Sequence, residues 1–244
     1  MSAREGKAWN NFMSILRIVA TPIGNLEDLT LRALRVLKES DFVLCEDTRV
    51  TKKLLDHYQI KTPTISYHQH SGKIKVEQII SLLKAKKNLA LVTDAGTPGI
   101  SDPGSKLVSI IRKEFKQEIG HKVLIESVPG VSALTAAISI AGVGFDRFLF
   151  LGFLPHKKGR QTMLKEIVAS KYSVVLYESK HRMVKLLTEL EAVCGRTELE
   201  ILVARELTKM HESFYQGTIA TVLKEIKADI NNLKGEFVVL IKKE

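Results

Sequence analysis

Cysteine and long apolar runs are scarce in this 244-residue chain. Two cysteines, Cys45 and Cys194, cannot build a disulfide framework or a four-cysteine zinc site, so a reducing cytoplasm is the expected compartment. No apolar run approaches the roughly 20 residues of a membrane-spanning helix, and residues 1–11 lack the apolar core of a signal peptide. We interpret residues 1–14 as a flexible tail and expect no membrane association.

Several common catalytic motifs are also missing. No Gly-x-Gly-x-x-Gly motif follows a predicted strand, and there is no Walker A loop or serine-hydrolase elbow. His211-Glu212 has no second histidine at the zinc-protease spacing, and His68 with His70 has no third ligand nearby. The sequence therefore predicts no metal site.

The charge balance is one-sided, with 37 basic against 27 acidic residues and a formal net charge of +10. A surplus of this size favours an anionic partner, such as nucleic acid or a membrane surface, without choosing between them. Hydrophobic residues make up 45% and charged residues 26%, which is ordinary for a folded globular chain.

Short apolar segments alternate with amphipathic segments over the first 140 residues, as in an α/β domain with a mostly parallel sheet. Strands are predicted at 15–20, 41–45, 65–68, 89–93 and 122–127. Helices are predicted after Thr30, which can cap the first of them, and at 48–58, 73–87, 103–115 and 131–141.

Residues 145–160 interrupt this alternation with four phenylalanines followed by basic residues. We predict an N-terminal α/β domain at 15–144, a linker at 145–160 and a C-terminal α/β domain at 161–244. The C-terminal strands at 173–177, 200–204, 212–217 and 237–241, with helices at 182–192 and 219–230, are typical of a mixed sheet.

Three predicted strands end in loops rich in Gly, Pro, Ser and Thr, at 21–25, 94–104 and 128–133. Ligands of open parallel sheets bind outside the carboxyl ends of the strands, where glycines let the backbone approach closely. Each loop alone could simply turn the chain, but three at one sheet edge favour a site for a nucleotide-like ligand. Ser132 and Ala133 open a helix whose free N–H groups could hold an anion.

These loops resemble the tetrapyrrole methylase superfamily and, within it, the 16S ribosomal RNA cytidine-2′-O-methyltransferases. Matching stretches run in order along most of the chain: VATPIGNLEDLTLRAL (19–34), CEDTRVTKKLL (45–55), LVTDAGTPGISDPG (91–104), VPGVSALTAAISIAG (128–142), FLFLGFLPHKKGR (148–160), YESKHR (177–182), ARELTKMHE (204–212) and GEFVVLI (235–241). The resemblance implies two α/β domains with S-adenosylmethionine in the cleft between them, a homodimer, and 16S rRNA of the small ribosomal subunit as the partner.

The resemblance also implies a set of cofactor-binding positions. They are Ile23, Gly24, Ala95, Gly96, Thr97, Ile100, Ser132, Ala133, Tyr177, Ala204, Arg205 and Glu236. The sequence departs from the family in reading Pro155-His156-Lys157 where Pro-Arg-Lys is common, and His68-Gln69-His70-Ser71 where His-Glu-His-Asn is common.

Methyl transfer to a ribose hydroxyl benefits from a general base, and residues 46–49 (Glu-Asp-Thr-Arg) follow an apolar strand. We expect Asp47 to act as base or hydroxyl orienter and Arg49 as a phosphate clamp. An Asp–Arg pair that only fixes the loop is an equal alternative, and lysine or tyrosine bases stay open.

Candidate RNA contacts are His68, His70, Lys157, Lys158, Arg160 and Arg182. The histidines could stack on or hydrogen-bond a splayed base, with core packing as the alternative. The basic run at 157–160 could contact phosphates or simply form a solvated face. Two other functions compete with rRNA ribose methylation: methylation of a small tetrapyrrole, and RNA binding without catalysis.

Overall fold

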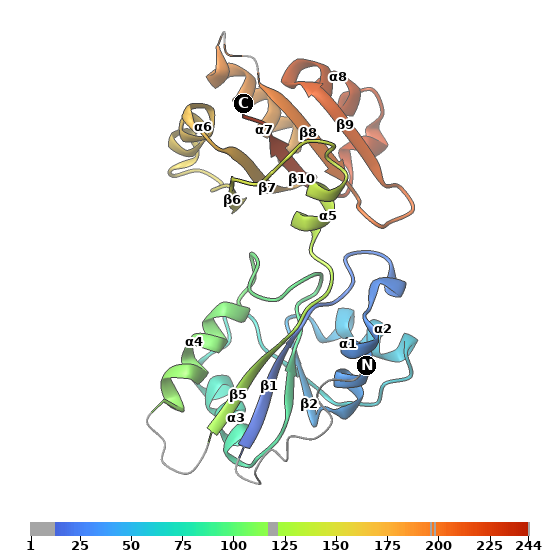
Figure 1. Ribbon diagram of the computed structural model, residues 1–244, viewed down its shortest axis with the longest axis vertical. Helices are drawn as coiled ribbons and strands as arrows, with labels where there is room; N and C mark the ends of the chain where they lie inside the picture. Colours follow the sequence, from blue (N-terminus) through green and yellow to red (C-terminus); the bar gives the residue numbers. More distant parts are fainter. Residues whose placement is uncertain (1–12, 117–121, 196, 198, 244) are drawn as a thin grey trace. The chain divides into compact units, whose positions relative to one another are not determined.

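The computed structural model describes residues 13–116, 122–195, 197 and 199–243, and it divides into two compact units (Figure 1). The first unit contains the chain up to Pro22 and Leu26–Val131. The second contains Ile23–Asn25 and Ser132–Glu244. The tail predicted at 1–14 lies outside the described residues except for Met13 and Ser14, where the prediction is wrong because both residues begin the first strand of the first unit and pair with residues 122 and 123.

The first unit is built on a five-stranded sheet in the order β3-β2-β4-β1-β5, and every described pairing is parallel. The strands are β1 (Met13–Val19), β2 (Phe42–Cys45), β3 (Thr64–Ser66), β4 (Leu89–Leu91) and β5 (Lys122–Val128). The helices are α1 (Leu31–Glu39), α2 (Thr48–His57), α3 (Lys73–Lys84) and α4 (Gly104–Glu114), with a short 3-10 turn, η1 (Leu26–Asp28).

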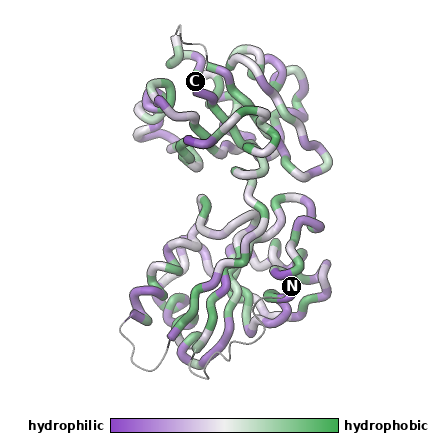
Figure 2. The backbone as a smooth tube through the Cα atoms, viewed as in Figure 1, coloured by the Kyte–Doolittle hydropathy of each residue, from purple (hydrophilic) through white to green (hydrophobic). Residues whose placement is uncertain are grey.

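Helices cover both faces of this sheet, which is why strands β2 and β4 are apolar along their whole length (Figure 2). On β2, Val43 and Cys45 point into a core shared with α1 and α2, whereas Leu44 points into a core shared with α3 and α4. The predicted cap is confirmed, because the Thr30 hydroxyl accepts a hydrogen bond from the Ala33 amide at 3.1 Å.

The second unit carries a mixed sheet in the order β6-β7-β10-β8-β9, in which only β6 and β7 run parallel. Its strands are β6 (Phe148–Phe153), β7 (Ser173–Ser179), β8 (Glu200–Arg205), β9 (Ser213–Thr218) and β10 (Glu236–Ile241). Its helices are α5 (Ala133–Ser139), α6 (Arg160–Ala169), α7 (Met183–Cys194) and α8 (Ile219–Lys227), with a 3-10 turn, η2 (Ile230–Leu233).

The large core of this unit lies between the sheet and helices α6, α7 and α8, with Leu176, Val203 and Val239 contributed by the strands. Tyr177, Val238 and Ala204 are paired across β7, β10 and β8, so their side chains share the opposite face. Helix α5 packs against β10. Within the described residues, no helix has the length and apolar character needed to cross a membrane.

The predicted fold class is confirmed, but the predicted domain boundary needs correction. The chain divides after Val131 and not near residue 145, because α5 packs against β10 in the second unit. Residues 145–160 are not a linker, since they contain β6, an edge strand of the second sheet. Neither β6 nor α6 was predicted from the sequence.

Candidate functional site

The loops after β1 and β4 meet at the carboxyl edge of the first sheet. These strands are neighbours in space although β2 and β3 lie between them in the sequence. The backbones of Thr21 and Gly96 exchange hydrogen bonds of 2.9 and 3.0 Å, and the Thr21 hydroxyl donates to the Thr93 carbonyl at 3.0 Å. The two predicted ligand-binding loops are therefore joined, as expected for an edge that presents backbone to a ligand.

Asp102 shapes the loop between β4 and α4. Its carboxylate accepts the Gly99 amide at 2.8 Å and the Gly104 amide at 2.7 Å. Gly99 has a φ of +95°, a backbone conformation that glycine adopts without the strain that a Cβ would cause. The hydroxyl of Thr97 donates to the Val131 carbonyl at 2.9 Å, which ties the same loop to the end of the first unit.

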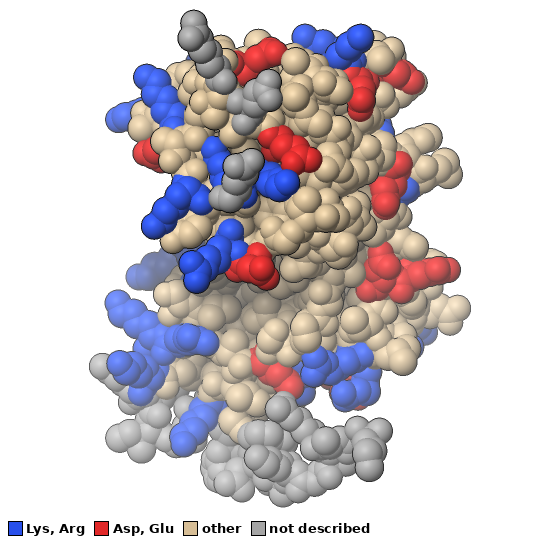
Figure 3. All heavy atoms as spheres, turned by 45° about the horizontal axis from the view of Figure 1, so that its top comes forward, with Lys and Arg blue, Asp and Glu red and all other residues tan. Residues whose placement is uncertain are grey.

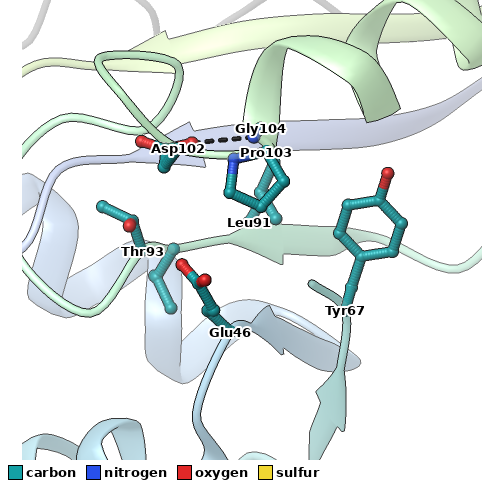
Figure 4. A pocket seen from close by; sticks show the side chains of 8 residues that line it. Glu46, Tyr67, Leu91, Thr93, Asp102, Pro103 and Gly104 are labelled. Carbon is teal, nitrogen blue, oxygen red and sulfur yellow. Dashed lines mark hydrogen bonds between the residues drawn. The ribbon is translucent and has the colours of Figure 1, made fainter. Parts of the chain in front are cut away.

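A shallow pocket lies at this edge (Figure 4). Residues from β4, from the loops after β2 and β3 and from the start of α4 line it: Glu46, Tyr67, Leu91, Val92, Thr93, Asp102, Pro103 and Gly104. One wall is apolar and another carries carboxylates, which suits a ligand with a cationic or hydroxyl group.

Asp47, the predicted base, is fully engaged by its neighbours. It is the N-cap of α2, and its carboxylate accepts the Arg49 backbone amide at 2.8 Å and the Arg49 guanidinium at 2.6 to 3.2 Å. The side-chain hydrogen bonds from Arg49 lower the pKa of Asp47 to about 2. This favours the alternative in which the Asp47–Arg49 pair fixes the loop, because so weak a base accepts a proton poorly near neutral pH.

Glu46 differs from the other carboxylates at this edge. Within the described chain, its side chain makes no hydrogen bond or ion pair, whereas Asp94 accepts the Asp47 amide at 3.0 Å and Asp102 is occupied as described above. Figure 4 shows the Glu46 carboxylate pointing into the pocket near Thr93. Burial raises the pKa of Glu46, and the charges of Asp94 and Asp102 raise it further, against a smaller opposite effect of His68.

The two candidate histidines follow β3 at the same edge. The rings of His68 and His70 lie 6.3 Å apart, and the His70 amide donates to His68 Nδ1 at 3.2 Å. His70 is exposed and His68 is half-buried. Among the residues that the structure describes, no group of three His, Cys, Asp or Glu side chains is arranged to hold a metal ion.

In the second unit, the start of α5 is bound by Tyr177. The Leu134 amide donates to the Tyr177 hydroxyl at 3.1 Å, and the Phe150 and Phe153 rings contact the tyrosine edge-on at 5.0 and 5.7 Å. Burial raises the pKa of Tyr177, although hydrogen bonds from Ser132 and Leu134 oppose the shift. One of the backbone amides at the start of α5 is thus already bound by the Tyr177 hydroxyl, which belongs to the same unit.

The segment Ile23–Asn25 packs onto the turn after β8. The Asn25 amide donates to the Thr208 hydroxyl at 3.1 Å, and a Cβ at Gly24 would overlap the Lys209 side chain. This segment is therefore held within the second unit, together with Ala204, which is buried on β8.

Lys209 in turn bridges two carboxylates of that turn. Its ammonium lies 2.9 Å from Glu206 and 2.8 Å from Glu236, one of the predicted cofactor positions. Burial acts to lower the pKa of Lys209, but the two carboxylates outweigh it and raise this pKa. Glu236 is therefore ion-paired within its own unit.

Arg205, another predicted cofactor contact, is buried at the end of β8. Its guanidinium donates to the carbonyls of Lys234, Asn231 and His211 at 2.7, 2.6 and 2.8 Å and to the Ser213 hydroxyl at 3.3 Å. This side chain organises the loops around it, so its guanidinium is not free to contact a ligand.

The basic run at the start of α6 contains two kinds of side chain. Lys157 and Lys158 are exposed, and the face drawn in Figure 3 carries Lys and Arg side chains interspersed with Asp and Glu side chains. The Arg160 side chain is only 3% exposed and pairs with Glu178 and Glu189. This burial removes its guanidinium from the surface and corrects the expectation of a direct phosphate contact. Arg182 is also largely buried, against Glu178 at 2.8 Å.

Comparison with known proteins defines the class. The family model of tetrapyrrole (corrin/porphyrin) methylases matches residues 16–223. Solved structures of two such enzymes share the fold over nearly the whole chain. Cobalt precorrin-4 methyltransferase has a TM-score of 0.66 at 17% identity, with 93% of this chain and 94% of that chain covered. Uroporphyrin-III C-methyltransferase from Thermus thermophilus, complexed with S-adenosyl homocysteine, has a TM-score of 0.63 at 20% identity, with 93% and 96% covered.

Curated relatives are far closer in sequence, and several of them are named ribosomal RNA small subunit methyltransferase I. The protein from Synechocystis sp. is 44% identical over 94% of this chain and 79% of its own length. Those from Hydrogenobaculum sp. and Thermotoga maritima are 42% and 40% identical, covering 94% and 88% of this chain and 96% and 93% of their own lengths. The chain belongs to this methyltransferase family within the tetrapyrrole methylases.

Two features of the site were missed from the sequence. Glu46 was included in the candidate cluster, but its neighbour Asp47 was preferred. The placement of Glu46 directly after β2 was the available signal, since the first residue beyond a parallel strand lies at the binding edge. Glu178 carried no such signal, because nothing in its local sequence indicates two arginine partners.

Proposed function

We propose that this protein transfers a methyl group from S-adenosylmethionine to the ribose 2′-hydroxyl of a cytidine in 16S rRNA of the small ribosomal subunit. The observation that carries this proposal is the 40–44% identity to small-subunit rRNA methyltransferases over most of both chains. The net charge of +10 supports an RNA partner over a small tetrapyrrole.

The first unit supplies much of the proposed cofactor site. The joined loops place Ala95, Gly96, Thr97 and Ile100 at the carboxyl edge of the first sheet, and Gly96, with a φ of +81°, has no side chain that would keep a ligand away from the backbone. When bound, S-adenosylmethionine supplies an electrophilic methyl carbon.

The remaining positions that the family resemblance implies for the cofactor lie in the second unit. These are Ile23, Gly24, Ser132, Ala133, Tyr177, Ala204, Arg205 and Glu236. Gly24 lies in the segment packed on Lys209, and the Arg205 side chain is already satisfied, so backbone contacts are proposed at both.

Glu46 is the carboxylate best suited to orient the ribose hydroxyl and take its proton. It points into the pocket without a partner, and its raised pKa makes it a stronger base than Asp47. A positioned base contributes about 10²- to 10⁴-fold to rate. Asp47 and Arg49 fix the loop that carries Glu46, and the exposed Arg49 edge is the proposed phosphate clamp.

RNA is proposed to bind through exposed basic and aromatic groups. Lys157 and Lys158 contact phosphates, and His68 and His70 meet an unstacked base beside the pocket. Arg160 and Arg182 are not among these direct contacts. We also propose that the working enzyme is a homodimer, which sedimentation equilibrium of the purified chain tests.

The decisive experiment is single-turnover methylation of unmethylated small subunits by wild type, Glu46→Gln and Asp47→Asn. We expect wild type to be active and Glu46→Gln to lose about 10²- to 10⁴-fold in rate, with unchanged affinity for S-adenosylmethionine by calorimetry. Asp47→Asn keeps the cap and should lose less. Equal losses in the two variants would refute the assignment of Glu46, and inactivity of wild type would refute the function.

A further inference from the structure

The exposed segment His156–Gly159 connects β6 to α6 and carries two of the proposed phosphate contacts. His156, Lys157, Lys158 and Gly159 are all exposed, whereas Leu154 before them and Arg160 after them are buried. Gly159 has a φ of +83°, which lets the chain turn sharply into the helix. The segment is thus a short basic loop with buried residues at both ends.

Beneath this loop lies a buried cluster of two arginines and two glutamates. Glu178, on β7, is fully buried and lies 2.8 Å from Arg182 Nε and 3.7 Å from Arg160 Nη1. Glu189, on α7, accepts from Arg160 Nε at 2.6 Å. The cluster is electrically balanced, so the arginines contribute no free charge to the surface.

Each arginine also holds the backbone at the start of the loop. Arg182 Nη1 donates to the Leu154 carbonyl at 2.9 Å, and Arg160 Nη1 donates to the Pro155 carbonyl at 3.3 Å. The Arg160 amide donates to the Lys157 carbonyl at 3.2 Å. Three hydrogen-bonded carbonyls, those of Leu154, Pro155 and Lys157, therefore fix the backbone that carries the two lysines.

We propose that Glu178, Arg160 and Arg182 are positioning residues that hold the loop His156–Gly159 in its RNA-binding conformation. This inference rests on the proposed function. The two lysines contact phosphate, and the cluster acts only through them, by ordering the loop before RNA arrives. A preordered loop binds more tightly because less conformational entropy is lost on association.

The test is a double-mutant cycle on affinity for small ribosomal subunits. Arg160→Lys keeps the buried positive charge, but a lysine ammonium cannot reach Glu178, Glu189 and the Pro155 carbonyl together. We expect a Kd for subunits raised roughly 3- to 10-fold, with the Kd for S-adenosylmethionine and the saturated rate within twofold of wild type. Arg35→Lys, in an exposed ion pair with Glu39, is the matched control and should change nothing.

Arg160→Lys is then made in a Lys157→Ala/Lys158→Ala background. The proposal predicts no further loss there, because the cluster has no phosphate-binding lysines left to present. An additive loss, or no effect of Arg160→Lys in the wild-type background, overturns it. If Arg160→Lys lacks a cooperative unfolding transition, Arg182→Lys enters the same cycle with the same two outcomes. Absence of subunit binding by wild type would instead refute the proposed function.

Discussion

Replacing Gly104 by alanine should loosen the loop that the cofactor is proposed to contact. A Cβ at this position would lie 2.9 Å from Asp102 Oδ1 and 3.1 Å from the Gly99 amide nitrogen. Asp102 would have to shift, weakening its bonds to both glycine amides, and hydrogen bonds to a charged group contribute about 1.5–3 kcal/mol each. Better helix propensity of alanine returns up to about 1 kcal/mol, so we expect a net loss of roughly 1–3 kcal/mol.

The assay is thermal unfolding followed by calorimetric titration with S-adenosylmethionine. At about 2–4 °C per kcal/mol for chains of this size, Tm should fall by roughly 2–12 °C, and cofactor affinity should fall about 10-fold. Gly144→Ala is the control, because Gly144 is exposed and its Cβ would meet nothing closer than 3.7 Å. A Gly104→Ala protein as stable as this control would refute the crowding argument.

Three further results are expected. Because the pKa of Glu46 is raised, the single-turnover rate should increase as pH rises through a value above 4.5, and Glu46→Gln should lose this increase. Ionising the wild-type Glu46 costs folding stability, so Glu46→Gln should be as stable as wild type at low pH and at least as stable at pH 7. A variant less stable than wild type at pH 7 would contradict the raised pKa. Burial raises the pKa of both cysteine thiols, so neither should react with a thiol reagent until the protein unfolds, and rapid native labelling would contradict their burial. Thr30→Ala and Thr218→Ala each remove a helix cap and should each cost about 1 kcal/mol in urea unfolding, whereas no loss would show that the caps are dispensable.

Much of the fold could be predicted from the sequence because its strands are buried on both faces or alternate with strongly amphipathic helices. β2 and β4 are apolar throughout, and α1 begins at a capping threonine. β6 and α6 escaped prediction for a physical reason. β6 is an edge strand with Leu149 and Phe153 exposed, and α6 has no marked apolar face, so neither shows the expected periodicity.

The candidate site was predicted in outline and not in its details. Collinear loops located the carboxyl edge of the first sheet, because loop chemistry is local in sequence. Which carboxylate is free depends on contacts that only the folded chain creates. The Arg49 guanidinium binds the carboxylate of Asp47, two residues before it in the sequence. The carboxylate of Glu46, the residue before Asp47, points into the pocket. Arg160 could not be placed either, since its partners Glu178 and Glu189 lie 18 and 29 residues away.

The most direct test of the account follows a labelled methyl group to its final atom. Small subunits are incubated with the wild-type protein and S-adenosylmethionine carrying a tritiated methyl group, and their 16S rRNA is digested to nucleosides. The account predicts label in 2′-O-methylcytidine alone. Label on a base, on another ribose, or on no RNA at all would contradict it.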